Sequence, residues 1–219
     1  MGYLLISLPY PYLAFHFHWC RSNQETSAAM SQYTNNPYIL IDGMHWEVNV
    51  GAKCQYFINQ TRLKAMIHQL NLMQEAYARV ICISFQLHLP EGAYSDDNKC
   101  ISKFLSTSKT LLKRTYQLKK HGYCWARERG SSNQQHYHVW FFLEGRKVQS
   151  SHKVASILKS HWKAISNGRL SLPKNPYYRL HRKDLLLKRA VIYRLSYLAK
   201  EQSKESQYQL KKYGCSRLR

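Results

Sequence analysis

RVICISFQLHL, residues 79–89, is the stretch on which the fold depends. It is rich in β-branched and aromatic residues and stops at Pro90, which is typical of a buried strand. Two further segments, YCWARE at 123–128 and QHYHVWFFL at 135–143, flank a Gly/Ser/Asn turn and predict a β-hairpin. Together these three strands predict the centre of an antiparallel sheet.

Four segments around these strands carry apolar residues at helical spacing. The predicted helices cover residues 56–77, 100–119, 153–165 and, as one long basic helix, 183–212. The order of helix, strand, helix, hairpin, helix and helix predicts an α+β domain in which helices flank a central antiparallel sheet. We assign this domain to residues 56–219. Residues 1–55 are expected to be irregular, with a short turn at Asp42-Gly43.

The chain of 219 residues is strongly basic, with 33 Lys and Arg against 12 Asp and Glu and a formal charge of +21. Because 44% of its residues are hydrophobic and 13% are aromatic, we expect it to fold rather than stay disordered. Residues 146–219 hold 19 basic and 3 acidic residues, or +16, interleaved with tyrosines. This mixture suits phosphate contacts and base stacking, so we expect a nucleic-acid partner and no membrane.

The cysteines and the N-terminal stretch bear on the compartment. The six cysteines include no CxxC pair, so we expect reduced thiols in a cytoplasmic protein of a bacterial host. Residues 1–19 are apolar, yet Pro9 and Pro11 interrupt them and they contain no basic residue, which argues against an export signal or a membrane span. His16 and His18 precede the first core strand and are not assigned to a site.

His136 and His138 lie two residues apart in the segment QHYHVWFFL. Alternate residues of a strand point to the same face, so both imidazoles project together and could bind one divalent metal. If the hairpin turn centres on Ser132, Glu128 lies opposite His136 and supplies a third ligand. Such a set leaves open positions and suits Mg²⁺ or Mn²⁺ as a Lewis acid. The alternative for Glu128 is a surface acid paired with a neighbouring arginine.

A second candidate group lies in YRLSYLAK, residues 193–200. On a helix, Tyr193 and Tyr197 are four residues apart and Lys200 is seven from the first, so one face presents two phenols and an ammonium. A tyrosine oxygen can attack as a nucleophile when a nearby cation favours the phenolate and a metal polarises the electrophile. The alternative is an amphipathic helix that packs both tyrosines into the core beside a solvated lysine.

The order of first strand, HxH strand and tyrosine helix resembles that of the HUH endonucleases, which nick single-stranded DNA in rolling-circle replication, conjugation and transposition. The Tyr-x3-Tyr-x2-Lys pattern is similar to that of their two-tyrosine class. RVICISFQLHLP, HYHVWFFLEG and VIYRLSYLAKEQSKE resemble inovirus-type replication proteins and the related prophage YagK/YfjJ family, over about residues 60–210. The resemblance implies an HUH endonuclease-like fold with a ferredoxin- or RRM-like core.

The same resemblance implies a rolling-circle replication initiator of a filamentous phage or prophage. The two histidines and Glu128 would hold Mg²⁺ or Mn²⁺. One tyrosine would attack the DNA, leaving a 5′-phosphotyrosine and a free 3′-OH, while Lys200 would neutralise charge or help to lower a phenol pKa. Basic residues expected to contact the DNA are Arg179, Arg182, Lys183, Lys188, Arg189 and Arg194. Expected partners are single-stranded DNA at a replication origin and, because the chain has no P-loop motif, a host helicase and polymerase.

A non-catalytic, regulatory DNA-binding protein derived from such an initiator is the alternative function. Basic charge alone supports it. The first strand of the family often carries an acid where this chain has Gln86, which also favours the alternative. An RNA-binding module is less well supported, because the sequence has no RRM, KH or dsRBD signature.

Overall fold

The computed structural model describes residues 32–95, 97–129, 134–201 and 211–218. In this part of the chain, six antiparallel strands form an open sheet in the order β10-β6-β7-β5-β8, and β9 also pairs with β5. These strands are β5 (Arg79–His88), β6 (Gly122–Arg129), β7 (Gln135–Glu144), β8 (Arg169–Ser171), β9 (Tyr177–His181) and β10 (Tyr213–Cys215). The expected α+β fold, with a central antiparallel sheet, is confirmed.

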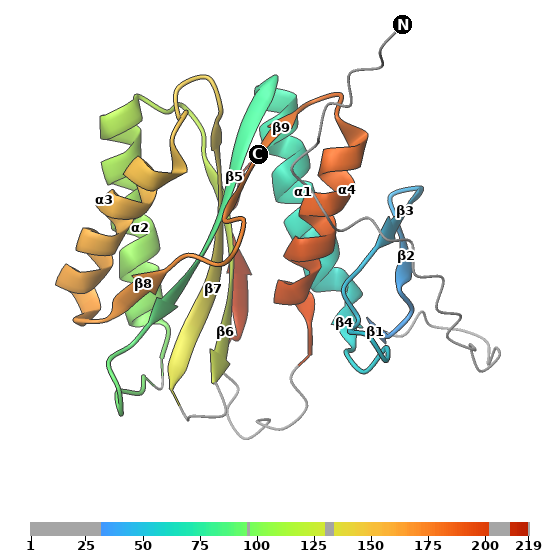
Figure 1. Ribbon diagram of the computed structural model, residues 1–219, viewed down its shortest axis with the longest axis horizontal. Helices are drawn as coiled ribbons and strands as arrows, with labels where there is room; N and C mark the ends of the chain where they lie inside the picture. The colour runs from blue at the N-terminus through green and yellow to red at the C-terminus, as the bar shows by residue number, and fades with distance from the viewer. Residues whose placement is uncertain (1–31, 96, 130–133, 202–210, 219) are drawn as a thin grey trace, which may run out of the picture.

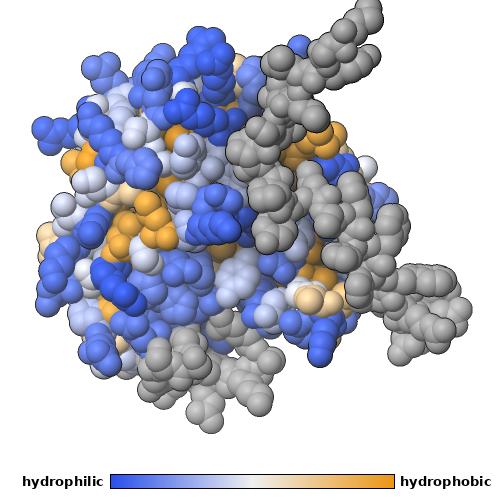
Figure 2. Space-filling view, viewed as in Figure 1, coloured by the Kyte–Doolittle hydropathy of each residue, from blue (hydrophilic) through white to orange (hydrophobic). Residues whose placement is uncertain are grey.

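Helices cover both faces of this sheet (Figure 1). On one face lie α2 (Lys99–Tyr116) and α3 (Ser151–Ser166). On the other lie α1 (Gln60–Ala76) and α4 (Leu185–Leu195), followed by the short 3-10 helix η1 (Ser196–Ala199). The space-filling view in Figure 2 shows mainly hydrophilic residues over α2 and α3, with hydrophobic residues in separate patches.

The sheet is buried on both faces near its middle, and each face has its own hydrophobic cluster. Ile81 and Ile83 of β5 pack in the cluster beneath α2 and α3. Val80 and Cys82 alternate with them and pack in the cluster beneath α1 and α4. Toward the end of β5, the face beneath α1 and α4 changes from apolar to polar residues, and the candidate site lies there.

Several predicted elements are confirmed with small changes at their ends. The strand over 79–89 and the hairpin strands appear as β5, β6 and β7. The first helix begins at Gln60 rather than 56, because the Asn59 side chain accepts a hydrogen bond from the Arg62 amide and caps it. α2 ends at Tyr116, where Gln117 adopts a left-handed conformation with φ of 52°.

The predicted long basic helix over 183–212 is wrong. Its α-helical part ends at Leu195, Ser196–Ala199 form the 3-10 helix η1, and Lys200 is extended, while residues 202–210 lie outside the described residues. Long-range contacts end the helix: Ser196 Oγ accepts a hydrogen bond from the Asn49 amide at 2.9 Å, and Lys200 forms a β-bridge with Ile58. Tertiary pairing here outweighs a helical sequence pattern.

The region expected to be irregular contains short strands. β1 (Tyr33–Thr34) pairs with β4 (Ile58–Asn59), and β2 (Tyr38–Ile41) forms a hairpin with β3 (Met44–Glu47). The expected turn at Asp42-Gly43 joins that hairpin, and both turn residues have positive φ angles, 50° and 76°. Ile39, Ile41 and Trp46 are buried in the cluster that includes α1 and α4. The domain boundary near residue 55 stays a prediction.

Some expectations concern cysteines and segments away from the sheet. Cys82, Cys100, Cys124 and Cys215 are free thiols, whereas Cys54 is disulfide-bonded, so the expectation of reduced thiols throughout is wrong. None of the described helices is long and apolar enough to cross a bilayer. The stretch 1–19, with His16 and His18, and the turn around Ser132 lie outside the described residues.

Candidate metal centre

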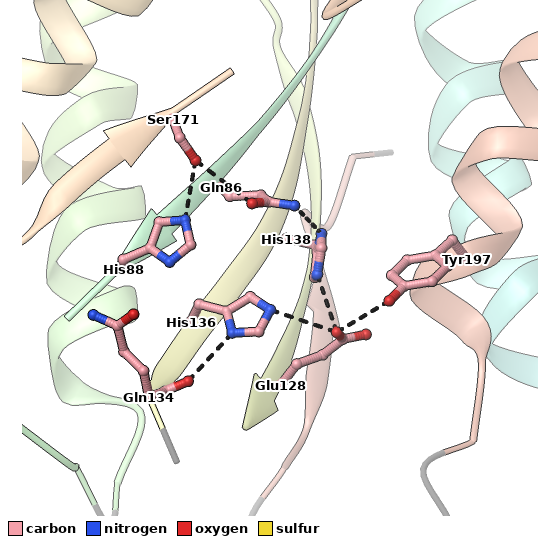
Figure 3. Close-up of polar contacts among 8 residues, drawn as sticks. All are labelled: Gln86, His88, Glu128, Gln134, His136, His138, Ser171 and Tyr197. Carbon is pink, nitrogen blue, oxygen red and sulfur yellow. Dashed lines mark hydrogen bonds and ion pairs between the residues drawn. The ribbon is translucent and has the colours of Figure 1, made fainter. Parts of the chain in front are cut away.

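Glu128, His136 and His138 form the metal-ligand cluster predicted from the sequence. The β6–β7 register pairs Glu128 with His136, and the two histidines alternate along β7 onto the same face. Nε2 of His138 lies 3.1 Å from Glu128 Oε2, and Nε2 of His136 lies 3.5 Å from the same oxygen (Figure 3). One ligand atom from each residue lies within 4.8 Å of the other two.

The second nitrogen of each imidazole is also held. Nδ1 of His136 lies 3.4 Å from the backbone oxygen of Gln134, and Nδ1 of His138 lies 3.4 Å from the side-chain amide of Gln86. Rotation of that amide by a half turn presents either its nitrogen or its oxygen to the ring. Outer contacts of this kind fix the ring orientation of metal-binding histidines and leave Nε2 for the metal.

Electrostatic interactions keep the Glu128 carboxylate ionised. Burial raises its pKa, but hydrogen bonds from His136 and His138 outweigh burial and hold that pKa well below the usual range. The hydrogen bond to Glu128 raises the pKa of His136 in return, against the effect of burial. A cation that takes up the imidazole nitrogens must displace any proton there, so metal binding would release protons.

The residues present fit a divalent metal ion. They offer two imidazole nitrogens and one carboxylate, all partly buried, and the second nitrogen of each imidazole has a neighbouring polar partner. Three protein ligands leave positions free for water or a phosphate oxygen. The choice of Mg²⁺ or Mn²⁺ stays a prediction, because this donor set also suits other divalent ions.

Tyr197 is the tyrosine that reaches this cluster. Its hydroxyl donates to Glu128 Oε2 at 3.2 Å, and its ring meets the His138 ring edge to face at 5.1 Å (Figure 3). Burial raises the pKa of Tyr197 to about 12, and the charge and hydrogen bond of Glu128 add to this effect. The phenol is therefore a hydrogen-bond donor beside the carboxylate.

Tyr193 lies apart from the cluster. It is 38% exposed on α4, and burial and then the Glu47 charge raise its pKa. The chain tightens into η1 after Leu195, so the predicted row of two phenols and an ammonium along one α-helix does not form. The structure brings one tyrosine to the metal ligands, and a catalytic role for Tyr193 stays a prediction.

Lys200 lies beside Tyr197, as expected from their spacing, but on extended chain after η1. Its ammonium is 3.5 Å from the centre of the Tyr56 ring and 5.5 Å from that of Tyr197. A small cavity of about 10 Å³ next to Glu128 is lined mainly by basic and apolar residues: Arg62, Ala126, Arg127, Leu198, Lys200 and Lys212. Basic side chains therefore line the small cavity next to Glu128.

The basic residues expected to contact DNA lie on β9, on α4 and on the turn between them. Four arginines donate to backbone carbonyls: Arg179 to Gln149, Arg182 to Gln74 and Glu75, Arg189 to His45, and Arg194 to Lys174 and Asn175. Lys183 is exposed, and burial lowers the pKa of Lys188, which lies over the Trp46 ring. Their contact with DNA stays a prediction.

The sequence reasoning missed His88 and Ser171. His88 pairs with His136 across β5 and β7, and the two rings stack with centroids 5.5 Å apart. Its Nε2 lies 3.0 Å from the Ser171 hydroxyl. Burial, followed by the charges of Arg169, His136 and His138, lowers its pKa to about 4. The alternation Gln86-x-His88 in a buried strand was the available signal, because it puts two polar side chains on one face.

The family model for the YagK/YfjJ C-terminal domain matches residues 47–216. The chain belongs to this family. Comparison with the curated proteins found no match, and neither did comparison with the solved structures. The part of the chain that matches the YagK/YfjJ C-terminal domain includes the whole six-stranded sheet, the four α-helices, the metal-ligand cluster and both tyrosines.

Proposed function

We propose that the protein is a metal-dependent enzyme that nicks and rejoins single-stranded DNA. The observation that carries the proposal is the 3.2 Å hydrogen bond from the Tyr197 hydroxyl to Glu128 Oε2, the oxygen toward which both histidines point. A nucleophile and a candidate divalent-cation site thus lie one hydrogen bond apart. Transesterification of a phosphodiester uses these two components.

Tyr197 forms the covalent intermediate. Its oxygen makes the new bond to phosphorus while the bond from phosphorus to the 3′ oxygen breaks, giving a 5′-phosphotyrosine and a 3′-OH. The phenol proton passes to solvent, and the leaving oxygen takes up a proton from water. In the joining step, a 3′-OH attacks and releases the tyrosine. A divalent ion held by Glu128, His136 and His138 would supply Lewis-acid stabilisation of the phosphate charge.

The surroundings of Tyr197 support this role. The Lys200 ammonium lies 5.5 Å from its ring, and the basic side chains around the cavity next to Glu128 suit the phosphates on either side of the cut. Tyr193 makes no side-chain hydrogen bond to this cluster among the described residues, so we assign the first cut to Tyr197. The resemblance of Tyr193 to the second tyrosine of the two-tyrosine class suggests a later cut, after rearrangement of the DNA.

The wider role is initiation of rolling-circle replication for a filamentous phage or prophage. The resemblance to inovirus-type replication proteins and the positive charge of residues 146–219 support it. The enzyme leaves a 3′-OH that a host polymerase extends, while a host helicase separates the strands. A DNA-binding protein without activity is the competing function.

The test uses end-labelled single-stranded oligonucleotides that tile the DNA around the gene, incubated with the full chain and Mn²⁺. We expect a covalent protein–DNA adduct that resists denaturation, and we expect EDTA or His138→Ala to abolish it. Tyr197→Phe removes only the attacking oxygen and should lower adduct formation at least about a thousandfold, comparable with loss of a catalytic nucleophile.

Tyr193→Phe is the matched control, because it removes the same oxygen four residues away. It should leave the first cut within about twofold of the wild type, well under 1 kcal/mol in transition-state stabilisation. An adduct that survives Tyr197→Phe would assign the attack to another residue. Binding of these oligonucleotides without any adduct would favour the non-catalytic alternative.

A further inference from the structure

A cavity of about 290 Å³ lies next to the metal-ligand cluster, between the sheet and the end of α4. It is lined by His138 of the cluster and by Tyr197, so a molecule inside it would lie beside the reacting groups. The other side chains that matter here are Asn49, Ser84, Gln86, Trp140 and Arg194. The volume is at the lower end of the range for small-molecule pockets, roughly 300 Å³ and above, which suits one planar group rather than a helix or duplex.

One aromatic ring in the lining of this cavity, that of Trp140, packs against Tyr178, which lies outside the lining. Trp140 of β7 is only 3% exposed, and its ring stacks on that of Tyr178 at 6.2 Å with 11° between the planes. Arg194 donates to the Tyr178 hydroxyl at 2.9 Å and to the Lys174 carbonyl at 3.1 Å. These contacts hold Tyr178, the Trp140 ring that packs on it and the chain at Lys174 in place before any ligand enters.

The polar groups of the cavity are amides and a hydroxyl. Gln86 and Asn49 provide carboxamides, and Ser84 provides a hydroxyl that donates to the Pro176 carbonyl. Among the described residues, the lining includes one guanidinium, that of Arg194, and no carboxylate. An uncharged ring with hydrogen-bonding edges therefore fits the cavity better than a cation does, and amides can pair with such edges.

We propose that this cavity binds the base of one nucleotide next to the cleaved phosphate and thereby helps to choose the cut position. The inference rests on the proposed function, because it takes single-stranded DNA as the ligand. A base stacked in the cavity fixes its own phosphate relative to Tyr197. Stacking on the partly exposed Tyr197 ring, which lines the cavity, tolerates any base, whereas the Asn49 and Gln86 amides discriminate between base edges.

The experiment measures binding rather than cutting, with Tyr197→Phe protein and a set of single-stranded oligonucleotides that each lack one base. We expect loss of one base, next to the cut position, to weaken binding about tenfold, and loss of the others to matter less than about twofold. Asn49→Ala should weaken binding of the intact oligonucleotide about fivefold and leave binding of that one abasic oligonucleotide unchanged.

Asn36→Ala is the matched control. The side chains of Asn36 and Asn49 each accept a hydrogen bond from the backbone amide two residues on, at 2.9 Å and 3.2 Å, but Asn36 lies outside the cavity. The Asn36→Ala variant should bind every oligonucleotide as tightly as the Tyr197→Phe protein into which it is introduced. Thermal melting of both variants reports any loss of folding.

The outcomes separate this inference from the proposed function. The base site is overturned, and nicking is left intact, if the wild type cuts DNA but no single missing base weakens binding more than the others. The same conclusion follows if Asn49→Ala weakens binding of all oligonucleotides equally. A single sensitive position without cutting by the wild type supports the base site and overturns nicking. Absence of any DNA binding overturns both.

Discussion

Oε2 of Glu128 is the atom at which three side chains of the site meet. It lies within hydrogen-bonding or ion-pair distance of His136, His138 and Tyr197. Burial alone would favour the neutral acid, but the hydrogen bonds from the histidines keep it charged. A buried carboxylate that is held ionised in this way is available to a divalent cation without first losing a proton.

Gln86 orients His138 by its contact with the Nδ1 atom of that imidazole, so replacing Gln86 should weaken metal binding. We expect Gln86→Leu to lower Mn²⁺ affinity at least about tenfold, because the imidazole loses the contact that fixes its orientation. Isothermal titration calorimetry measures the change. Gln86→Glu offers a carboxylate oxygen that accepts from Nδ1–H of a metal-bound imidazole, and it should keep wild-type affinity or exceed it. Equal affinity for Gln86→Leu and the wild type would show that the contact has no such role.

His121 makes stability depend on pH. Its two ring nitrogens have no hydrogen-bond partner among the described residues, and burial, with the charges of Lys109 and Lys113, lowers its pKa to about 4. The unfolded chain takes up a proton near pH 6.5, so the folded state loses stability as pH falls from there toward 4. This amounts to about 2 kcal/mol between pH 7 and pH 5.

The variant His121→Phe should remove that part of the pH dependence. A phenyl ring fits beside the aromatic neighbours Tyr123 and Phe141. Urea unfolding at the two pH values gives the difference in free energy for each protein. If the variant loses as much stability as the wild type on acidification, the dependence arises from other groups.

At the scale of elements, the site depends on a change from apolar to polar side chains along three neighbouring strands. β5, β6 and β7 present Val80, Cys124 and Phe142 to the α1–α4 face near the middle of the sheet. Further along, the same face carries Glu128 and His138. The register holds both parts in line, so the apolar part anchors the strands that align the polar part. η1 then brings Tyr197 over the polar end.

The β6–β10 register predicts that Cys124 and Cys215 can form a disulfide bond. They are directly opposite each other on the two strands. The hydrogen bond from the Ser216 amide to the Tyr123 carbonyl shows that the neighbouring pair, Tyr123 and Ser216, is a hydrogen-bonded pair. The cysteines therefore occupy a non-hydrogen-bonded pair, with Cα atoms about 4.5 Å apart, within the range that a disulfide needs. Their thiols are already in contact.

Diamide, which accepts two electrons and two protons from a pair of thiols, should convert these cysteines to a disulfide. Peptide mass spectrometry after digestion identifies the linked pair. Cys215→Ser should abolish this crosslink, and Cys100, on α2, is the internal control that stays unlinked to either. A crosslink of Cys124 to another cysteine would contradict the register.

At the scale of the whole molecule, the positive charge is not spread evenly. Residues 146–219 carry +16 of the total +21. In the structure this part of the chain includes α3 on one face of the sheet and β9 and α4 toward the other. Several of its arginines are already bonded to backbone carbonyls, so the exposed lysines are the better candidates for contacts with phosphates.

Binding of single-stranded DNA should therefore weaken with salt. If about four phosphates are neutralised, the logarithm of the affinity falls with a slope near −3 against the logarithm of the salt concentration. Fluorescence anisotropy at 50 to 200 mM salt measures it, and the affinity should drop about fiftyfold over that range. Lys183→Gln should reduce the slope by about 0.7, whereas Lys159→Gln on α3 should not. Affinity that is insensitive to salt would contradict a phosphate-based interface.

Local sequence signals were enough to identify the three central strands and the candidate metal-ligand cluster. Period-two alternation places His136 and His138 on one face, and the short hairpin sets Glu128 opposite His136. These relations depend only on the geometry of a strand and the length of a turn, which the neighbouring residues determine. The helices that flank the sheet follow in the same way from apolar spacing along short segments.

The choice between the two tyrosines depended on the tertiary structure. Tyr193 and Tyr197 have equal claims in the sequence, and only the contacts of Ser196 with Asn49 and of Lys200 with Ile58 end α4 and turn Tyr197 toward Glu128. Those pairs are separated by well over a hundred residues, so no local pattern encodes them. Backbone hydrogen bonding and burial across the folded chain outweigh the helical propensity of the segment, and they determine which phenol meets the metal ligands.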